Sequence, residues 1–149
     1  MKRMKIALGC DHGGINLKGA IKKYLISKNI EVEDFGTNSS ESVNYPEYAI
    51  KVSKAVISKE CDLGILCCGT GIGMSIAANK HKGIRAAVVG DCFSAKMTRE
   101  HNNTNVLCLG ERVTGEGLAL TIVDTWINSK FQGGRHSERL ALVEEIENK

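Results

Sequence analysis

The segment Asp62-Leu-Gly-Ile-Leu-Cys-Cys-Gly-Thr-Gly-Ile-Gly-Met-Ser75 is the feature around which this chain of 149 residues is arranged. Its apolar run at residues 63–67 predicts a buried strand, and a glycine-rich turn then leads into a predicted helix at residues 71–82. Such a turn directs several backbone N–H groups into one space, where they favour an anion. Cys68 and Thr70 lie on this turn. A candidate base, a hydroxyl and anion-stabilising donors therefore stand together, which points to proton-transfer chemistry.

Strand and helix patterns alternate along the rest of the chain. Apolar runs predict five strands, at residues 5–10, 31–35, 63–67, 84–89 and 105–109. Helical spacing predicts helices at residues 15–28, from Tyr45-Pro46 onward, and at 71–82, 91–100, 115–128 and 136–147. This alternation predicts an α/β fold, a three-layer, doubly wound, Rossmann-like parallel sheet of five strands with helices on both faces. The last helix follows Gly133-Gly134 as an extra C-terminal element, and we expect it to pack on a partner subunit.

Within these helices the apolar residues are expected to face the core. Phe93 and Met97 are predicted to point inward from one helix, and Leu118, Ile122 and Trp126 form the predicted apolar stripe of the next. The terminal helix has its own apolar positions, at Leu140, Val143 and Ile146.

Length and composition exclude several classes of protein. The length predicts one domain over residues 1–149. A net charge of +3 and few aromatic residues argue against nucleic acid as a partner. No apolar segment is long enough to span a membrane, and the apolar run at residues 6–10 is too short for a signal peptide. Six cysteines without metal or redox spacing predict no disulfides and a reducing, cytoplasmic location.

Ligands of doubly wound sheets bind beyond the carboxyl ends of the strands. The polar or glycine residues that follow the predicted strands are Asp11, His12, Cys68, Gly69, Thr70, Gly71, Gly73, Asp91, Glu111 and Arg112. Cys68 has two interpretations, a buried structural thiol or a thiolate stabilised by the helix N-terminus that acts as nucleophile or base. Neighbouring Cys67 is expected to point to the opposite face of the sheet.

The glycine turn matches neither common nucleotide-binding motif. Residues 69–73 lack the lysine of a Walker loop and the third glycine of a dinucleotide fingerprint. Tight packing between strand and helix is the simplest alternative explanation for these glycines. His101, followed by Asn102, is a candidate acid or base. Arg135 and Arg139 share a helix face and could grip a phosphate. No group of His, Asp and Glu has metal-ligand spacing, so no metal is expected.

Four motifs together resemble ribose-5-phosphate isomerase type B, in a family that also includes the subunits of galactose-6-phosphate isomerase. The motifs are Gly9-Cys-Asp-His-Gly-Gly14, Cys68-Gly-Thr-Gly-Ile-Gly73, His101-Asn-Asn-Thr-Asn105 and Gly133-Gly-Arg-His136. They occur in the family's order and the match covers essentially the whole chain. The resemblance implies interconversion of ribose 5-phosphate and ribulose 5-phosphate through a cis-enediolate, without a cofactor or metal. It also implies a homodimer whose sites are built from both subunits, and some members are tetramers.

The resemblance also implies roles for individual residues. Cys68 matches the base, Thr70 the hydroxyl that helps to move a proton between the sugar oxygens, and His101 the acid that opens the furanose ring. The backbone at Gly69, Gly71, Ile72 and Gly73 matches the anion hole for the enediolate. The remaining matches are substrate contacts: Asp11 to sugar oxygens, Asn102 to the sugar or anion hole, and His12, Arg112, Arg135 and Arg139 to the phosphate and substrate.

The chain departs from one branch of the family at the position of the catalytic base. Another branch of the family carries a glutamate base six residues after the Cys68 position, where this chain has Met74. Methionine cannot accept a proton, so the family's logic leaves Cys68 as the base.

The same motifs would serve a hexose 6-phosphate such as allose or galactose 6-phosphate. A sugar-phosphate-binding module without catalysis is the alternative from another class, because a fold does not determine function.

Overall fold

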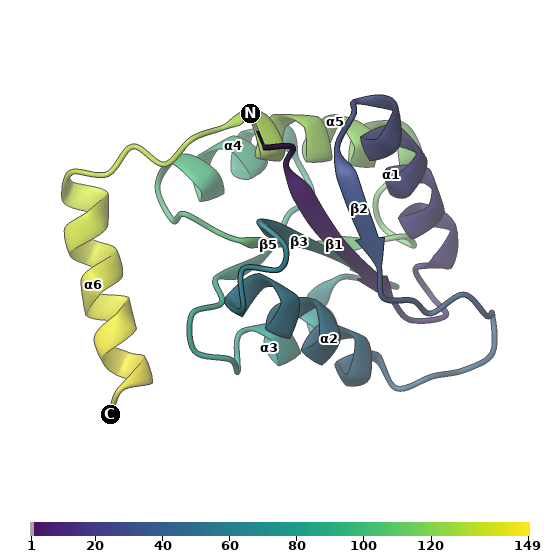
Figure 1. Cartoon of the computed structure of the whole chain (residues 1–149), viewed down its shortest axis with the longest axis horizontal. Coiled ribbons are helices and arrows are strands. Elements are labelled where there is room, and N and C mark those ends of the chain that lie inside the picture. The colour runs from purple at the N-terminus through teal and green to yellow at the C-terminus, as the bar shows by residue number, and fades with distance from the viewer. Residues whose placement is uncertain (1) are drawn as a thin grey trace.

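A computed structural model describes residues 2–149, which form one sheet of five parallel strands and six helices (Figure 1). The strands are β1 (Lys5–Cys10), β2 (Glu31–Asp34), β3 (Leu63–Cys68), β4 (Ala86–Val88) and β5 (Val106–Gly110). The helices are α1 (Ile15–Ser27), α2 (Tyr45–Ile57), α3 (Ile72–Ala78), α4 (Cys92–Glu100), α5 (Glu116–Asn128) and α6 (Arg135–Glu147). The predicted fold class is thereby confirmed.

The sheet order is β2-β1-β3-β5-β4, so the winding direction reverses between β1 and β3. The crevice beyond the carboxyl ends of strands at such a switch point is the usual ligand site of this architecture. Residues 11–14 and 68–73 leave their strands there side by side, because Cys10 pairs with Cys67 in the β1–β3 register.

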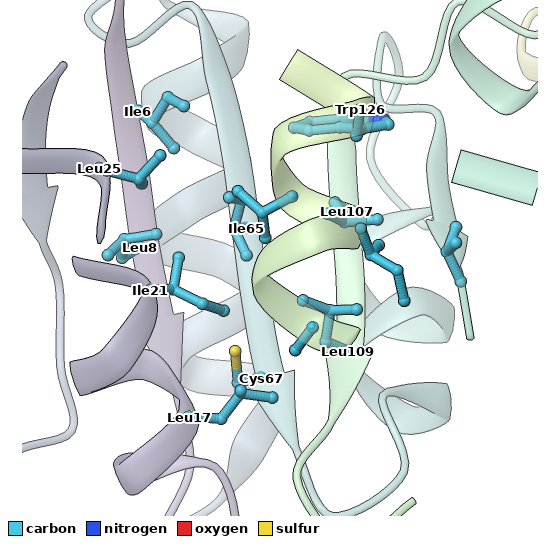
Figure 2. Close-up of a cluster of buried hydrophobic side chains, with 14 of the residues drawn as sticks. Ile6, Leu8, Leu17, Ile21, Leu25, Ile65, Cys67, Leu107, Leu109 and Trp126 are labelled. Carbon is cyan, nitrogen blue, oxygen red and sulfur yellow. The ribbon is translucent and has the colours of Figure 1, made fainter. Parts of the chain in front are cut away.

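Two apolar clusters cover the two faces of the sheet. On one face α1 and α5 pack against Ile6, Leu8, Ile65, Cys67 and Leu107 (Figure 2). On the other face α2 and α3 pack against a second set that includes Leu66, Cys68 and Cys108. Cys67 and Cys68 therefore point to opposite faces, as the strand alternation predicted.

The third helix is shorter than predicted. It ends at Ala78 instead of continuing to residue 82. The amide of Asn79 donates to the Ala86 carbonyl at 2.9 Å and accepts from the Ala86 N–H at 2.8 Å. These two bonds tie the end of α3 to the edge strand β4, and the chain turns there.

Two predicted core residues lie on the surface. Phe93 is 74% exposed and Leu118 is 46% exposed, so both predictions were wrong for the single chain. Ile122 and Trp126 are fully buried as predicted. Helical spacing identifies an apolar stripe but not the edge where that stripe leaves the core, and Phe93 and Leu118 lie near the starts of their helices.

Helix α6 stands apart from the sheet at the left of Figure 1. Its apolar residues Val143 and Ile146 are exposed within the single chain. None of the helices in residues 2–149 combines the length and the apolar character needed to cross a membrane.

Candidate functional site

Two turns meet in close contact at the switch point. A Cβ atom on Gly13 would lie 3.2 Å from the Gly69 nitrogen, and one on Gly14 would lie 2.5 Å from the Cys67 carbonyl. A side chain at residue 14 would therefore overlap the backbone of β3. These glycines let the turn after β1 lie directly against the turn after β3.

Cys68 ends β3 and is 6% exposed. Its Sγ accepts the backbone N–H of Gly71 at 3.0 Å. Gly71 provides this contact from the left-handed region, with φ +83°, and a Cβ there would lie 3.0 Å from the Leu109 carbonyl carbon. The turn thus directs a backbone N–H donor at the sulfur of Cys68.

The neighbouring thiols have different surroundings. Burial raises the pKa of Cys10 to about 11, and burial also raises the pKa of Cys67 and Cys108 above the ordinary value of 9.0. These three thiols keep their protons at neutral pH. All three are buried in the core, where they serve as structural apolar residues.

The rest of the glycine turn forms the wall of the site. Thr70 is exposed, and its Oγ1 accepts the Ile72 N–H at 3.2 Å. The ring of Tyr45 packs on Gly73, where a Cβ would lie 2.8 Å from the ring. Tyr45 is not among the site residues expected from the sequence, yet its ring lies against the glycine turn. Its only sequence signal was the Tyr45-Pro46 pair at the start of α2, which indicates a helix start and not a ligand contact.

Asp11 and His12 occupy the turn after β1. The Asp11 carboxylate accepts the Gly13 N–H at 2.8 Å, which shapes the turn. The Nδ1 atom of His12 accepts the Val43 N–H at 3.2 Å, so the loop after β2 is bonded to this histidine. Both side chains are half-buried.

The turn after β5 contributes Arg112. Its backbone N–H donates to the Gly69 carbonyl at 3.0 Å, and its side chain lies over Gly69, 3.5 Å from a Cβ built there. Two other polar residues beyond strand ends have structural partners. Glu111 accepts the Leu17 N–H at 2.7 Å near the start of α1, and Asp91 accepts the Ser94 N–H at 2.7 Å at the start of α4.

A second polar cluster lies toward the amino ends of the strands, opposite the turns described above. His101 follows the end of α4, and its ring stacks on His136 of α6 with centroids 4.2 Å apart and planes at 12°. Asn102 follows His101, and the exposed Arg135 and Arg139 lie on α6 beside His136. Burial, and then the neighbouring His101 and the two arginines, lower the pKa of His136 below 6.5.

The two clusters are far apart within one chain. The segment after His101 enters β5 at Val106, which pairs with Gly64 at the start of β3. Cys68 pairs with Gly110 at the other end of these two strands. Four residues of strand separate these two pairs, or about 13 Å. The structure therefore brings Asp11, His12, residues 68–73 and Arg112 together. It does not bring His101, Asn102, Arg135 or Arg139 to them within a single chain.

A groove of about 810 Å³ separates α6 from the body of the molecule. Ile84, Arg85 and Asn102 line one wall, and Leu140, Val143 and Ile146 of α6 line the other. The apolar stripe of α6 predicted from the sequence thus faces a groove and not the core of its own chain.

Comparison with known proteins gives a consistent result. The family model described as Ribose/Galactose Isomerase matches residues 6–143. The chain is 52% identical to ribose-5-phosphate isomerase B of Escherichia coli, over 96% of each protein. It resembles the structure of Clostridium thermocellum ribose-5-phosphate isomerase B with a TM-score of 0.97 and 57% identity, over 97% of this chain and 98% of that one. The Mycoplasma genitalium enzyme with bound ribulose-5-phosphate matches with a TM-score of 0.94 and 38% identity, over 100% and 99%.

Proposed function

Because the chain belongs to the ribose/galactose isomerase family, we propose that it interconverts ribose 5-phosphate and ribulose 5-phosphate, a reaction of the pentose phosphate pathway. The observation that carries this proposal is the position of Cys68 on the turn at the switch point between β1 and β3, where its Sγ accepts a hydrogen bond from the Gly71 N–H. The whole chain forms one sugar-phosphate isomerase domain under this proposal, and the family model matches most of its length.

The reaction is a transfer of one proton between neighbouring carbons. The Cys68 thiolate takes the proton from C2 of the open-chain aldose. The electron pair left on C2 forms the C1–C2 double bond of a cis-enediolate, and the π pair of the C1 carbonyl moves onto O1. The backbone N–H groups of residues 69–73 that are not bonded to Cys68 Sγ or Thr70 Oγ1 stabilise the charge on the enediolate oxygen. Thr70 assists the proton transfer from O2 to O1. The Cys68 thiol then returns its proton to C1, which gives the ketose.

The other polar residues bind and prepare the substrate. His101 donates the proton that opens the furanose ring, and Asp11 and Asn102 contact the sugar. His12, Arg112, Arg135 and Arg139 contact the phosphate and the substrate, because guanidinium groups and imidazole N–H groups donate well to phosphate oxygens.

Each site draws on two chains of a homodimer. Cys68 and His101 lie toward opposite ends of the strands, so a partner is needed to place His101, Asn102, Arg135 and Arg139 opposite Cys68. The apolar wall of the α6 groove supports this assembly, since an exposed apolar face of this kind is suited to a subunit interface. A reducing cytoplasm is the proposed location, where the thiol of Cys68 stays reduced.

A mixed dimer tests this proposal. One subunit carries Cys68→Ala and the other His101→Ala, and the two chains are co-expressed with different tags. A mixed dimer then holds one site with both defects and one intact site, so about half of the wild-type activity is expected. Each variant alone is expected to be nearly inactive. A mixed dimer as inactive as its parents would place both residues in one chain's site.

Hydrogen exchange separates an isomerase from a binding module. In D2O, an isomerase incorporates solvent deuterium into ribose 5-phosphate at C2 and into ribulose 5-phosphate at C1, whereas a binding module exchanges nothing. A panel of aldose phosphates, including allose 6-phosphate, measures the preference between pentose and hexose substrates.

A further inference from the structure

The ammonium group of Lys18 is buried at the junction between α1 and the loop that follows β2. Lys18 is only 3% exposed. Its Nζ donates to the Asp34 carboxylate at 2.9 Å, to the Thr37 carbonyl at 2.8 Å and to the Asn38 side-chain oxygen at 2.9 Å. An ammonium group has three donors, so these contacts account for all of them.

Neighbouring Lys22 gives a useful contrast. It contacts the other Asp34 oxygen at 3.3 Å, and its side chain is 43% exposed. Burial alone raises the pKa of Asp34, but hydrogen bonds from Lys18, the Gly36 N–H and Lys22 outweigh burial and lower it, so Asp34 is a carboxylate. Lys22 is a half-exposed partner of that carboxylate, whereas Lys18 also holds two oxygens of the loop.

The loop held by Lys18 reaches the candidate site. Its residue Val43 donates its N–H to Nδ1 of His12 at 3.2 Å. Between the two ends, Thr37 Oγ1 accepts the Ser39 N–H and Ser39 Oγ accepts the Glu41 N–H. A chain of short-range bonds thus runs from the buried ammonium toward the histidine.

The contact with Val43 also determines the form of His12. A backbone N–H can donate only to a ring nitrogen that carries no proton, so neutral His12 holds its proton on Nε2. Nε2–H is then the donor that His12 can offer to a phosphate oxygen. Displacement of the loop would break the Val43–His12 hydrogen bond, and the imidazole ring could then rotate and carry its proton on either nitrogen.

We propose that Lys18 is a positioning residue for substrate binding, which acts through the loop of residues 37–43 to hold His12 in its Nε2–H form at the phosphate end of the site. The inference rests on the proposed function, in which His12 contacts the phosphate. Lys18 itself does not touch the substrate.

Substrate binding by Lys18→Met and Lys22→Met variants tests the proposal. The KM for ribose 5-phosphate and the Ki of inorganic phosphate are both expected to rise about tenfold in Lys18→Met, with kcat within about twofold, because misplaced binding groups act at this scale. Lys22→Met removes a lysine from the same carboxylate but leaves the loop contacts, and both constants are expected to stay within about twofold. Equal behaviour of the two variants would overturn the proposal.

A double variant distinguishes positioning of His12 from a general effect. His12→Asn should raise KM by itself, and adding Lys18→Met should raise it no further, because residues that act through one contact are not additive. A KM in the double variant that is raised by the product of the two single effects would overturn the proposal. An unchanged KM in His12→Asn would instead refute the phosphate role of His12 in the proposed function. In that case the NMR spectrum of the His12 ring decides whether Lys18 positions it.

The imidazole nitrogens of His12 report positioning directly. Long-range 15N–1H spectra, assigned by loss of signals in His12→Asn, should show the Nε2–H form in the wild type and a mixture of forms in Lys18→Met. If Lys18→Met does not fold, Asn38→Ala keeps the Lys18–Asp34 pair and removes one loop contact, and a rise in KM of about threefold with a partial change in the spectrum is expected. An unchanged His12 spectrum in a folded variant would overturn the proposal.

Discussion

The sulfur of Cys68 lies 3.0 Å from the backbone nitrogen of Gly71, which donates its N–H to it. Adjacent Cys67 points to the other face of the sheet and packs in the apolar core (Figure 2). The two neighbouring cysteines therefore lie on opposite faces of the sheet, and the sulfur of Cys68 is bonded to the glycine turn.

Replacing Cys68 by alanine should lower kcat by a factor of roughly 10² to 10⁴, the usual contribution of a general base. The matched control is Cys67→Ala, which removes the same atom one residue earlier. This control should lose some stability through its core cavity but keep its activity. Isomerase assays and thermal melts of both variants check the prediction. Full activity in Cys68→Ala would remove the thiol from the mechanism.

His101→Ala should harm the turnover of ring-closed ribose 5-phosphate more than that of an open-chain analogue. Only the ring-closed sugar needs the acid that opens the furanose. The ratio of kcat/KM for the two substrates is the measurement. Equal losses on both substrates would assign His101 a role other than ring opening.

Arg135→Ala or Arg139→Ala should raise the KM for ribose 5-phosphate by roughly tenfold or more. Hydrogen bonds to charged groups contribute about 1.5–3 kcal/mol, and both guanidinium groups are exposed and free to reach a phosphate on a partner chain. Arg3→Ala is the control, because the Arg3 side chain donates to the Asn29 carbonyl, away from both clusters. Steady-state kinetics check this prediction, and unchanged KM values would mean that both side chains are merely solvated.

The stacked pair of His101 and His136 predicts a loss of stability in acid. The pKa of His136 is lowered below 6.5 in the folded chain by burial and by His101, Arg135 and Arg139. Below pH 6.5 the unfolded chain therefore binds more protons than the folded chain, and the free energy of unfolding falls as the pH drops toward the folded pKa. Above pH 6.5 this contribution is constant.

Denaturant unfolding at pH 5.5 to 7.5, at a fixed protein concentration, measures this effect. The decrease in acid should be shallower in His136→Asn than in the wild type. His81→Asn serves as the control that leaves the stacked pair intact, and it should retain the contribution of His136. A curve for His136→Asn that is parallel to the wild type would contradict the lowered pKa.

Two glycine-to-alanine substitutions should change stability in opposite directions. Gly14→Ala forces a Cβ to within 2.5 Å of the Cys67 carbonyl, so it should destabilise the fold by about 1–3 kcal/mol or more and lower activity. Gly19 lies within α1, and apart from its chain neighbours and the adjacent backbone of its own helix, no atom of the described residues comes within 4 Å of a Cβ built there. Gly19→Ala should therefore stabilise by about 0.5–1 kcal/mol, since alanine favours the helix. Thermal melts of both variants provide the comparison.

The local pattern of residues determined the elements and their sequence along the chain. The first strand has the predicted bounds, Lys5–Cys10, and the glycines at residues 69–73 form the predicted turn beside the sulfur of Cys68. These features depend on neighbours in sequence, such as side-chain alternation, turn glycines and helix starts, so the sequence alone carries them. The motifs also identified the family, and the comparison with known proteins confirmed it.

Only the tertiary structure decided which of these elements meet. The order β2-β1-β3-β5-β4 places the turns after β1 and β3 together, whereas His101 and His136 lie toward the opposite, amino ends of the strands. The contact between Val43 and His12, and the exposure of Phe93, also depend on packing between distant segments. The physical reason is that periodicity shows that a helix face is apolar but not what covers it, and the same apolar stripe serves a core or a partner subunit.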